Sequence, residues 1–373
     1  MVRIAHVTDC YLPRTGGIET QVRALAMHQA AAGHDVSIIT ATPGAVRSGT
    51  EVIDAIPVRR ITAKIPGDLP IHPRTRHHVA HALQENPVDV VHVHVGVISP
   101  FAWGAIRAAH QLTLPTVVTV HGIWGPIASP GYRLSDLVAK WSKWGVTVSA
   151  VSEVAALAIE QAVPALAPVF VLPNGIDVAD WQLPARQHEP STLNLVTVMR
   201  LAPRKRTLPL LKIVKAAQDR AGVNTRIHLR LIGDGPERSR AESFVQQQGL
   251  SDLVSFAGRL DHAGIREIFA MSDAYVQPSV KESFGIAALE ARAAGLPVIA
   301  RSQTGTTQFI RDHQEGLLAE TDSGMASAIA SLAADRALLA QLGEHNRTIA
   351  PEQSWPLVLA RVDEAYAHAR RLD

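Results

Sequence analysis

The sequence predicts an α/β protein made of two doubly wound domains, each built on a parallel sheet. Short β-rich runs alternate with helical stretches along the 373 residues, and such alternation indicates parallel strands joined by crossover helices. The alternation restarts near residue 193, after residues 181–191, which carry two prolines and show no hydrophobic period. The length also fits two domains of ordinary size.

Each domain is expected to begin with a buried strand and to continue with strand–helix units. The first helix, residues 18–32, should end at Gly33, because glycine commonly follows the last turn of a helix. A last amphipathic helix is expected over residues 356–371. The predicted strands are residues 3–8, 35–40, 88–95, 115–120, 146–151 and 169–172, then 193–199, 227–232, 253–257, 274–277, 298–300 and 316–318.

Composition and charge narrow the class of protein. Hydrophobic residues make up 47% of the chain and charged residues 19%, which is ordinary for a soluble enzyme. The net charge of +2 is too small to give an overall positive field that would attract nucleic acid. Cys10 is the single cysteine, so no internal disulfide forms and a reducing compartment is favoured. The N-terminus lacks a signal-peptide pattern and no apolar run has transmembrane length, so a cytoplasmic protein is expected.

Doubly wound sheets bind ligands beyond the carboxyl ends of their strands, so unusual residues at these positions are candidates for a site. Gly16 and Gly17 follow the first strand and open a helix, where free backbone N–H groups favour an anion. A plain tight turn is the alternative. His121 ends the strand at 115–120 and either faces the ligand or is a hydrogen-bonded structural histidine.

Two cations follow the first strand of the second domain. Arg200 ends that strand, and Lys205 lies near the start of the next helix. Two positive charges in one strand-to-helix loop suit a diphosphate group, although a solvated basic loop would have the same sequence. Residues 233–236, Gly-Asp-Gly-Pro, follow the next strand and are interpreted as a structural turn.

The strongest pattern runs from Glu282 to Glu290, after the strand at 274–277. Glu282 is expected in the loop, Gly285 at the start of the next helix, and Glu290 about one to two turns inside it. The two carboxylates would then occupy different depths of one site. Two unrelated surface glutamates are disfavoured, because a charge in the apolar stretch around Glu290 needs a partner.

Two histidine pairs have spacings that metal sites also use. His92 and His94 alternate on one strand and share a face, but no third ligand lies nearby in the sequence, so structural roles are favoured. His77 and His81 lack the glutamate of a His-Glu-x-x-His zinc motif and indicate surface positions. No metal site is therefore predicted.

At these residues the chain resembles glycosyltransferase family 4, and the resemblance covers nearly the whole sequence. The spacing of Glu282 and Glu290 is its most specific part, and residues 174–177 match the Asn-Gly-Ile-Asp of the family. The resemblance implies the GT-B fold, in which two Rossmann-like doubly wound domains enclose a cleft. Other motifs in family order are Gly16-Gly17, His121-Gly122, Arg200, Lys205 and residues 233–236.

The resemblance also implies what each domain does. Residues 1–181 would form the N-terminal, acceptor-binding domain, and the helix at 356–373 would pack back on it after a crossing at Trp355 and Pro356. Residues 182–355 would form the C-terminal domain, which binds the nucleotide sugar.

Site residues follow by position within the family. Arg200 and Lys205 would hold the donor diphosphate, and Glu282 would contact the transferred hexose. His121 would lie near the 6-position of the sugar and its reacting face. The other donor-binding residues implied are Gly16 and Gly17 at the phosphates, Gly258 and Arg259 at the base, Ser283, Phe284, Gly285 and Ile286 through backbone N–H groups, and Glu290 at the ribose hydroxyls.

The implied activity is transfer of a hexose or N-acetylhexosamine from a UDP or GDP sugar to an acceptor hydroxyl, with retention of the anomeric configuration. No cofactor, metal or nucleic acid is expected, and the acceptor, lipid-linked or phosphorylated, stays open. A sugar-nucleotide 2-epimerase of the same architecture and a non-catalytic nucleotide-sugar-binding protein are the alternatives. A Rossmann dehydrogenase is disfavoured because no Gly-x-Gly-x-x-Gly follows the first strand.

Two further features leave alternatives open. Arg206 stands where many family members have glycine, and it either adds a charge to the site or faces solvent. A basic segment at residues 59–78 is interpreted as a contact for the inner face of a membrane, as a contact for a phosphorylated acceptor, or as a solvated loop. Its basic residues are Arg59, Arg60, Lys64, Arg74, Arg76, His77 and His78.

Overall fold

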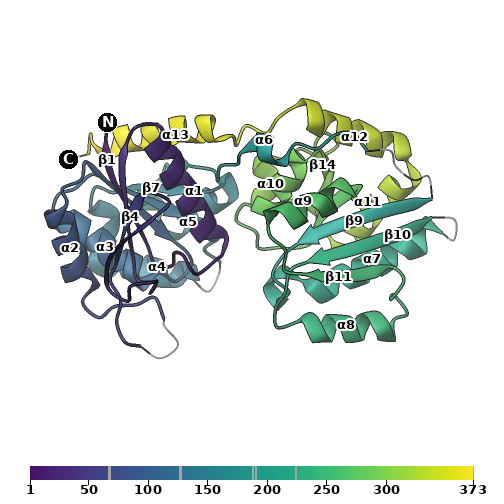
Figure 1. Cartoon of the computed structure of the whole chain (residues 1–373), viewed down its shortest axis with the longest axis horizontal. Helices are drawn as coiled ribbons and strands as arrows, with labels where there is room; N and C mark the ends of the chain where they lie inside the picture. The colour runs from purple at the N-terminus through teal and green to yellow at the C-terminus, as the bar shows by residue number, and fades with distance from the viewer. Residues whose placement is uncertain (66–68, 126–127, 187–188, 190, 223–224, 373) are drawn as a thin grey trace. The chain divides into compact units, whose positions relative to one another are not determined.

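The computed structural model describes residues 1–372 except 66–68, 126–127, 187–188, 190 and 223–224. The chain forms two compact units, each with its own sheet (Figure 1). The first unit comprises Met1–Gly175 and Gln353–Asp373, and the second comprises Ile176–Glu352. The prediction of two α/β domains with parallel sheets is therefore confirmed.

The first unit is built on an eight-stranded sheet with the order β3-β4-β2-β1-β5-β6-β7-β8. Neighbouring strands run parallel except β3 and β4, which form an antiparallel pair at one edge. The bounds are β1 Arg3–Thr8, β2 Asp35–Thr40, β3 Gly49–Ile53, β4 Ile56–Arg60, β5 Val90–Val95, β6 Thr116–Val120, β7 Thr147–Ala150 and β8 Phe170–Val171.

Helices cover both faces of this sheet, because successive strand residues point to opposite sides. Helices α1 and α13 pack on the face that carries Ile4, Val90 and Val117. Helices α2, α3 and α5 pack on the other face, which carries Val7 and Val93. The bounds are α1 Gly17–Ala31, α2 Thr75–Glu85, α3 Pro100–Gln111, α4 Ala128–Ala139, η2 Trp141–Lys143, α5 Glu153–Ala162, η3 Pro164–Leu166 and α13 Trp355–Ala369.

The second unit has a six-stranded sheet with the order β11-β10-β9-β12-β13-β14, parallel throughout. Its strands are β9 Thr192–Val198, β10 Arg226–Ile232, β11 Val254–Gly258, β12 Ala274–Gln277, β13 Val298–Arg301 and β14 Gly316–Ala319. Its helices are α6 Val178–Trp181, η4 Pro203–Lys205, α7 Thr207–Ala221, α8 Arg238–Gln247, α9 His262–Ala270, α10 Ile286–Ala293, η5 Gly305–Gln308, α11 Asp322–Ala334 and α12 Arg336–Thr348.

The boundaries between the units differ from the predicted ones. The first unit ends at Gly175 rather than at residue 181, because Trp181 is buried in the second unit against His262 and Phe269. The tail joins the first unit at Gln353 rather than at residue 356. Trp355 stacks on His28 and lies so close to Gly175 that a Cβ there would be 2.5 Å from its ring. Only glycine at position 175 leaves room for this indole.

Each predicted strand is present within one or two residues of its expected ends. The β3–β4 hairpin was not predicted, because both strands are short and β3 carries no fully buried side chain. The hairpin places Arg59 and Arg60 in a strand, so the alternative of a solvated basic loop does not hold for these two residues.

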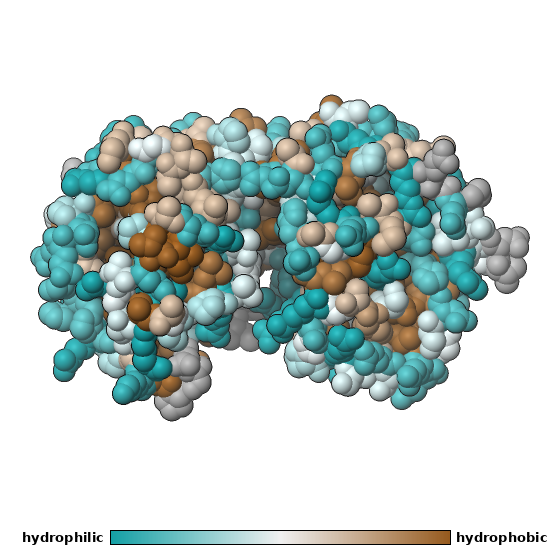
Figure 2. Space-filling view, in the orientation of Figure 1, coloured by the Kyte–Doolittle hydropathy of each residue, from teal (hydrophilic) through white to brown (hydrophobic). Residues whose placement is uncertain are grey.

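Hydrophilic residues cover much of the face shown in Figure 2, with hydrophobic patches between them. Within the described ranges, no helix combines the length and the apolar character that crossing a membrane requires.

Candidate active site

The carboxyl edge of the second sheet holds an ion pair between a half-buried lysine and a buried glutamate. Because β9 and β12 are parallel neighbours, their carboxyl ends lie at the same edge, and η4 meets the loop after β12 there. Lys205 Nζ lies 2.5 Å from Glu282 Oε2, and Gln277 donates to the same oxygen at 2.7 Å. Glu282 is buried, so these contacts provide the partners that a buried carboxylate requires.

The loop after Glu282 is held in a conformation that only small residues allow. Gly285 directly precedes α10 and has φ 94°. In this left-handed conformation a residue with an L side chain would be strained. The segment that contains η5 supports the loop from behind: a Cβ on Gly305 would lie 1.9 Å from the carbonyl oxygen of Ser283, and one on Gly285 would lie 2.8 Å from Thr306. The N-terminal N–H groups of α10 are therefore held at the same edge as Glu282.

Glu290 lies in α10 and is partly buried. Burial raises the pKa of its carboxyl group to about 8, and among the described residues no side chain is hydrogen-bonded to it. The pKa of Tyr275 is raised by burial and also by the charges of Glu282 and Glu290. Both carboxylates thus act on one buried phenol, which places them in one region and argues against two unrelated surface glutamates.

The remaining predicted donor residues also follow strand ends of this sheet. Arg200 is exposed just after β9, and Gly258 ends β11, with exposed Arg259 next to it. Gly233 donates to the Gly258 carbonyl at 2.6 Å. A Cβ on Gly233 would lie 1.9 Å from the carbonyl oxygen of Met199, so this turn is structural, as predicted.

Arg206 adopts φ 65°, a left-handed conformation that glycine accepts most readily. The glycine that the family resemblance implies at this position would adopt this conformation without strain. Its guanidinium forms two hydrogen bonds to Asp322, at 2.8 and 2.6 Å, and Arg301 pairs with the same carboxylate. Arg206 is therefore engaged in an ion pair and is not simply facing solvent.

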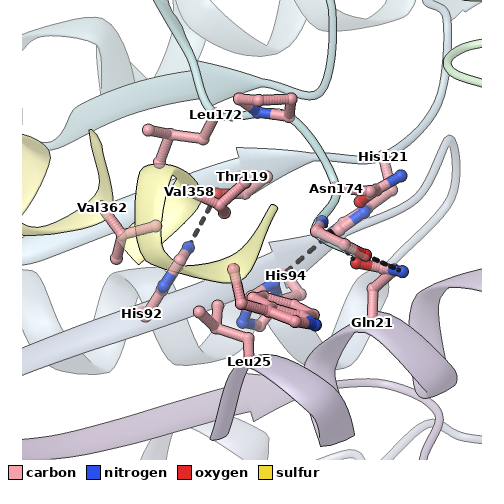
Figure 3. A pocket seen from close by; sticks show the side chains of 13 residues that line it. Gln21, Leu25, His92, His94, Thr119, His121, Leu172, Asn174, Val358 and Val362 are labelled. Carbon is pink, nitrogen blue, oxygen red and sulfur yellow. Dashed lines mark hydrogen bonds between the residues drawn. The ribbon is translucent and has the colours of Figure 1, made fainter. Parts of the chain in front are cut away.

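In the first unit, His121 follows β6 and its backbone N–H donates to Val95 at 2.8 Å. Its Nε2 lies 3.1 Å from Nδ1 of buried His94 (Figure 3). Burial lowers the pKa of His121 to about 4. The imidazole is consequently neutral at physiological pH, which suits a hydrogen-bonding partner of a substrate better than a cation.

His92 and His94 meet His6 of β1, and the ring nitrogens of these histidines lie within 4.8 Å of one another, close enough for a metal ion. Each ring nitrogen is instead hydrogen-bonded to a protein group. His6 and His94 are hydrogen-bonded to each other, and the other partners are Gln29, Tyr366, Thr119 and His121. The structural interpretation of His92 and His94 is thus supported.

Models of known protein families match both units of the chain. The family model for glycosyltransferase family 4 matches residues 15–180. The model for group 1 glycosyl transferases matches residues 182–349. The chain belongs to glycosyltransferase family 4.

Related transferases match along nearly the whole chain. A phosphatidylinositol N-acetylglucosaminyltransferase protein of Arabidopsis thaliana is 24% identical, and the match covers 99% of this chain and 82% of the relative. A GDP-mannose-dependent alpha-mannosyltransferase of Mycolicibacterium smegmatis is 26% identical, covering 98% and 96%. The crystal structure of Anabaena HepE in complex with UDP and glucose has a TM-score of 0.76 at 18% identity, covering 98% and 100%. The protein is a glycosyltransferase with the GT-B fold.

The first unit of the glycosyltransferase contains a pocket of about 310 Å³ at the carboxyl ends of β1 and β5. Asp9, Glu19, Ser99 and His94 are among its lining residues. Burial raises the pKa of Asp9 to about 6, although the Phe101 backbone N–H donates to it at 3.0 Å. Asp9 was not among the predicted site residues, although its position directly after the first strand could have indicated it.

Gly16 and Gly17 lie beside this pocket, whose lining includes Ile18 and Glu19. Gly16 has an extended backbone and precedes α1, and a Cβ there would approach only the flexible Glu19 carboxylate. The backbone N–H groups at the start of α1 are therefore close to the pocket, as an anion-binding role requires.

The basic segment of the glycosyltransferase is less continuous than its sequence indicated. Arg60 is buried and pairs with Glu51, while Arg59 pairs with Glu85 at 3.3 Å. Arg74 and Arg76 are exposed at the start of α2. Residues 66–68 lie outside the described part. The prediction of a surface charge at Arg60 is wrong, because its guanidinium also donates to the carbonyls of Thr42 and Leu12 in the interior.

Proposed function

We propose that the enzyme transfers a hexose or N-acetylhexosamine from a nucleoside-diphosphate sugar to an acceptor hydroxyl, with retention of the anomeric configuration. The observation that carries this proposal is the ion pair of half-buried Lys205 with buried Glu282, next to the N-terminus of α10. A cation, a carboxylate and free backbone N–H groups suit a diphosphate and the sugar attached to it. The UDP and glucose bound to HepE support this class of donor.

In the proposed reaction, the acceptor oxygen forms a bond to the anomeric carbon as the bond from that carbon to the diphosphate oxygen breaks. The acceptor proton passes to the leaving phosphate on the same face of the sugar. Arg200 and Lys205 stabilise the charge that develops on the leaving group, and Glu282 positions the hexose. Divalent metal is not required, because these cations and the α10 N-terminus neutralise the diphosphate and no Asp-x-Asp occurs in the chain.

The acceptor is proposed to bind in the pocket of the first unit and to carry phosphate, free or in a lipid headgroup. Exposed Arg74 and Arg76 support this choice, as does the relative named for phosphatidylinositol. A 2-epimerase remains the second candidate, since it would use the same donor site without an acceptor.

The deciding experiment screens UDP, GDP and ADP sugars by thermal shift, then follows product formation by NMR in excess EDTA. One nucleotide series should raise the melting temperature, because a ligand that binds only the folded state stabilises it by mass action. The product should keep the donor's anomeric configuration, and EDTA should leave the rate unchanged. Inverted product, turnover that returns only with manganese, or epimerised nucleotide sugar without acceptor would each contradict the proposal.

The affinity for the nucleoside diphosphate should rise with pH through Glu290. Ribose hydroxyls donate to the ionised carboxylate and thereby favour it, whereas burial holds the pKa of the free carboxyl at about 8. Binding then releases a proton, so affinity should increase by up to about tenfold per pH unit below 8 and level off above it. Titration calorimetry from pH 6 to 9 measures this slope.

Glu290→Gln is the matched control, because it keeps the side-chain shape and removes the titration. In this variant, the change of affinity with pH should shrink to the part that titration of the diphosphate itself contributes. The folded-state pKa lies above the unfolded value, so ionisation opposes folding as pH rises toward 8. The variant should therefore melt at a higher temperature than wild type at pH 8 and not at pH 4. An equal pH slope in both proteins would rule out Glu290 as the titrating group.

A further inference from the structure

Helix α4 of the first unit exposes its large aliphatic side chains and contains no buried residue. Leu134, Leu137 and Val138 are 63%, 72% and 79% exposed. Their spacing of three and four residues places them side by side on one face of the helix, the α4 apolar face. Single exposed apolar residues are ordinary, whereas apolar residues that gather on an exposed surface mark an interaction site.

The other side of α4 is fastened to the unit. Tyr132 stacks on Trp124, with ring centroids 3.7 Å apart, and its hydroxyl donates to the Val97 carbonyl at 2.6 Å. One turn further on, Asp136 accepts from the backbone N–H and from the hydroxyl of Ser142, at 2.8 and 2.9 Å. Residues four positions apart share a helix face, so Tyr132 and Asp136 hold that face inward. The α4 apolar face is consequently turned toward solvent.

The charges around the α4 apolar face are positive. Arg133, Lys140 and Lys143 lie beside the aliphatic residues or just after them, and all three are exposed. Within the described ranges, none of these cations forms an ion pair. Asp136 is the single acidic residue of residues 128–145, and its carboxylate already accepts two hydrogen bonds. The surface therefore complements a partner that is both apolar and negatively charged.

We infer that α4 is a docking helix for the surface of an anionic lipid bilayer. The helix lies in the plane of the membrane, with the α4 apolar face among the acyl chains and the three cations at the headgroups. This is the arrangement by which an amphipathic helix binds a membrane without crossing it. Cations near an anionic surface add to the affinity that the aliphatic side chains provide.

Two features favour lipid over protein as the partner. Leucine and valine are under-represented among the residues that dominate protein–protein binding, and lysine is depleted at such interfaces. The α4 apolar face offers leucine and valine bordered by lysine. In a two-fold dimer each copy would meet the same face of the other, and the like charges of both copies would come together. A bilayer with anionic headgroups accommodates the aliphatic side chains and the cations at once.

The docking helix is tied to the pocket of the first unit. Tyr132 of α4 donates to the carbonyl of Val97. The next residue, Ile98, lines that pocket and is 87% exposed, so it lies at the pocket mouth. Docking of α4 thus brings this mouth toward the headgroups, where a lipid-linked acceptor would be presented. Only this use of docking rests on the proposed function, because membrane binding itself requires no sugar nucleotide.

The first test measures binding of the full chain to vesicles by co-sedimentation, without sugar nucleotide. Wild type should bind vesicles of equimolar phosphatidylcholine and phosphatidylglycerol, and it should bind more weakly in high salt or to phosphatidylcholine alone. Leu134→Ser and Val138→Ser should each weaken binding about 3- to 30-fold, because each withdraws an aliphatic side chain from the acyl layer. Lys140→Ser and Lys143→Ser should each weaken it about 5-fold.

Leu357→Ser is the matched control, because it removes an exposed leucine from α13. That helix packs on the opposite face of the sheet from the cluster against which Tyr132 packs. The control should bind the mixed vesicles like wild type. The altered side chains are exposed in every variant, so all melting temperatures should stay close to that of wild type, and this measurement identifies any variant that fails to fold.

A second test locates the contact on the chain. Cys10→Ser removes the single natural cysteine, and Leu137→Cys in that background carries a polarity-sensitive fluorophore. With the mixed vesicles its emission should shift to shorter wavelength, and spin-labelled acyl chains should quench it. The same label at Leu357→Cys should report an aqueous environment throughout.

Three results would overturn the inference. The first is a wild type that does not bind the mixed vesicles. The second is binding that survives every α4 variant and is lost in an Arg74→Ser, Arg76→Ser double variant, which would assign the contact to α2. The third is a wild type that is dimeric in light scattering and monomeric in Leu134→Ser, which would assign the α4 apolar face to a second copy. Failure of the proposed function is distinguishable, since no sugar nucleotide would then turn over while vesicle binding would persist.

Discussion

Arg200→Ala and Lys205→Ala are each expected to weaken binding of the nucleoside diphosphate by about 10- to 150-fold, since a hydrogen bond to a charged group contributes about 1.5–3 kcal/mol. The loss should appear with every donor that the enzyme accepts, because the diphosphate is common to all. Titration calorimetry with the nucleoside diphosphate alone isolates this contribution from any contact with the sugar.

Arg204→Ala is the matched control, because Arg204 is exposed in the same turn as Lys205. Its affinity should stay close to that of wild type. Lys205→Ala has a second effect: it leaves Glu282 buried without its cation, so this variant should also melt at a lower temperature. Wild-type affinity in Arg200→Ala would show that the diphosphate binds elsewhere.

Glu282→Ala is expected to lower turnover by about 100- to 1,000-fold, the range seen when one preorganised group in an active site is removed. The affinity for the nucleoside diphosphate should stay the same or rise, since Lys205 is released from its 2.5 Å contact and its charge becomes available. Single-turnover kinetics together with calorimetry separate the two effects.

Glu267→Ala removes an exposed carboxylate on α9. It should change neither the turnover nor the affinity for the nucleoside diphosphate. Glu282→Gln should lie between wild type and Glu282→Ala, because an amide oxygen can still accept from Gln277. A loss of donor affinity as large as the loss of turnover would assign Glu282 to ground-state binding rather than to positioning of the hexose.

Local patterns in the sequence were sufficient for the strands and for the choice of a candidate site. The β1, β2 and β12 bounds agree with the predicted residues 3–8, 35–40 and 274–277. An apolar run rich in β-formers indicates a strand that is buried in a sheet, and this pattern can be recognised from residues that are neighbours in the chain. The rule that parallel sheets bind ligands at their carboxyl ends then selected Arg200, Glu282 and Gly285.

The pairings within the site were decided by the tertiary structure. Lys205 and Glu282 are 77 positions apart and meet because β9 and β12 are neighbours in the sheet, although β10 and β11 lie between them in sequence. The support from Gly305 and Thr306, and the burial of Arg60, depend on strand order in the same way. No periodicity along the chain encodes which strand ends become adjacent.

The buried cluster of His6, His92 and His94 shows the same division. The sequence indicated that His92 and His94 share a face and are structural, because side chains alternate along a strand. It did not indicate that Gln29 and Tyr366, 337 positions apart, would join them. A hydrogen bond needs a donor and an acceptor within about 3 Å. Only the packing of α1 and α13 on this sheet brings those groups together.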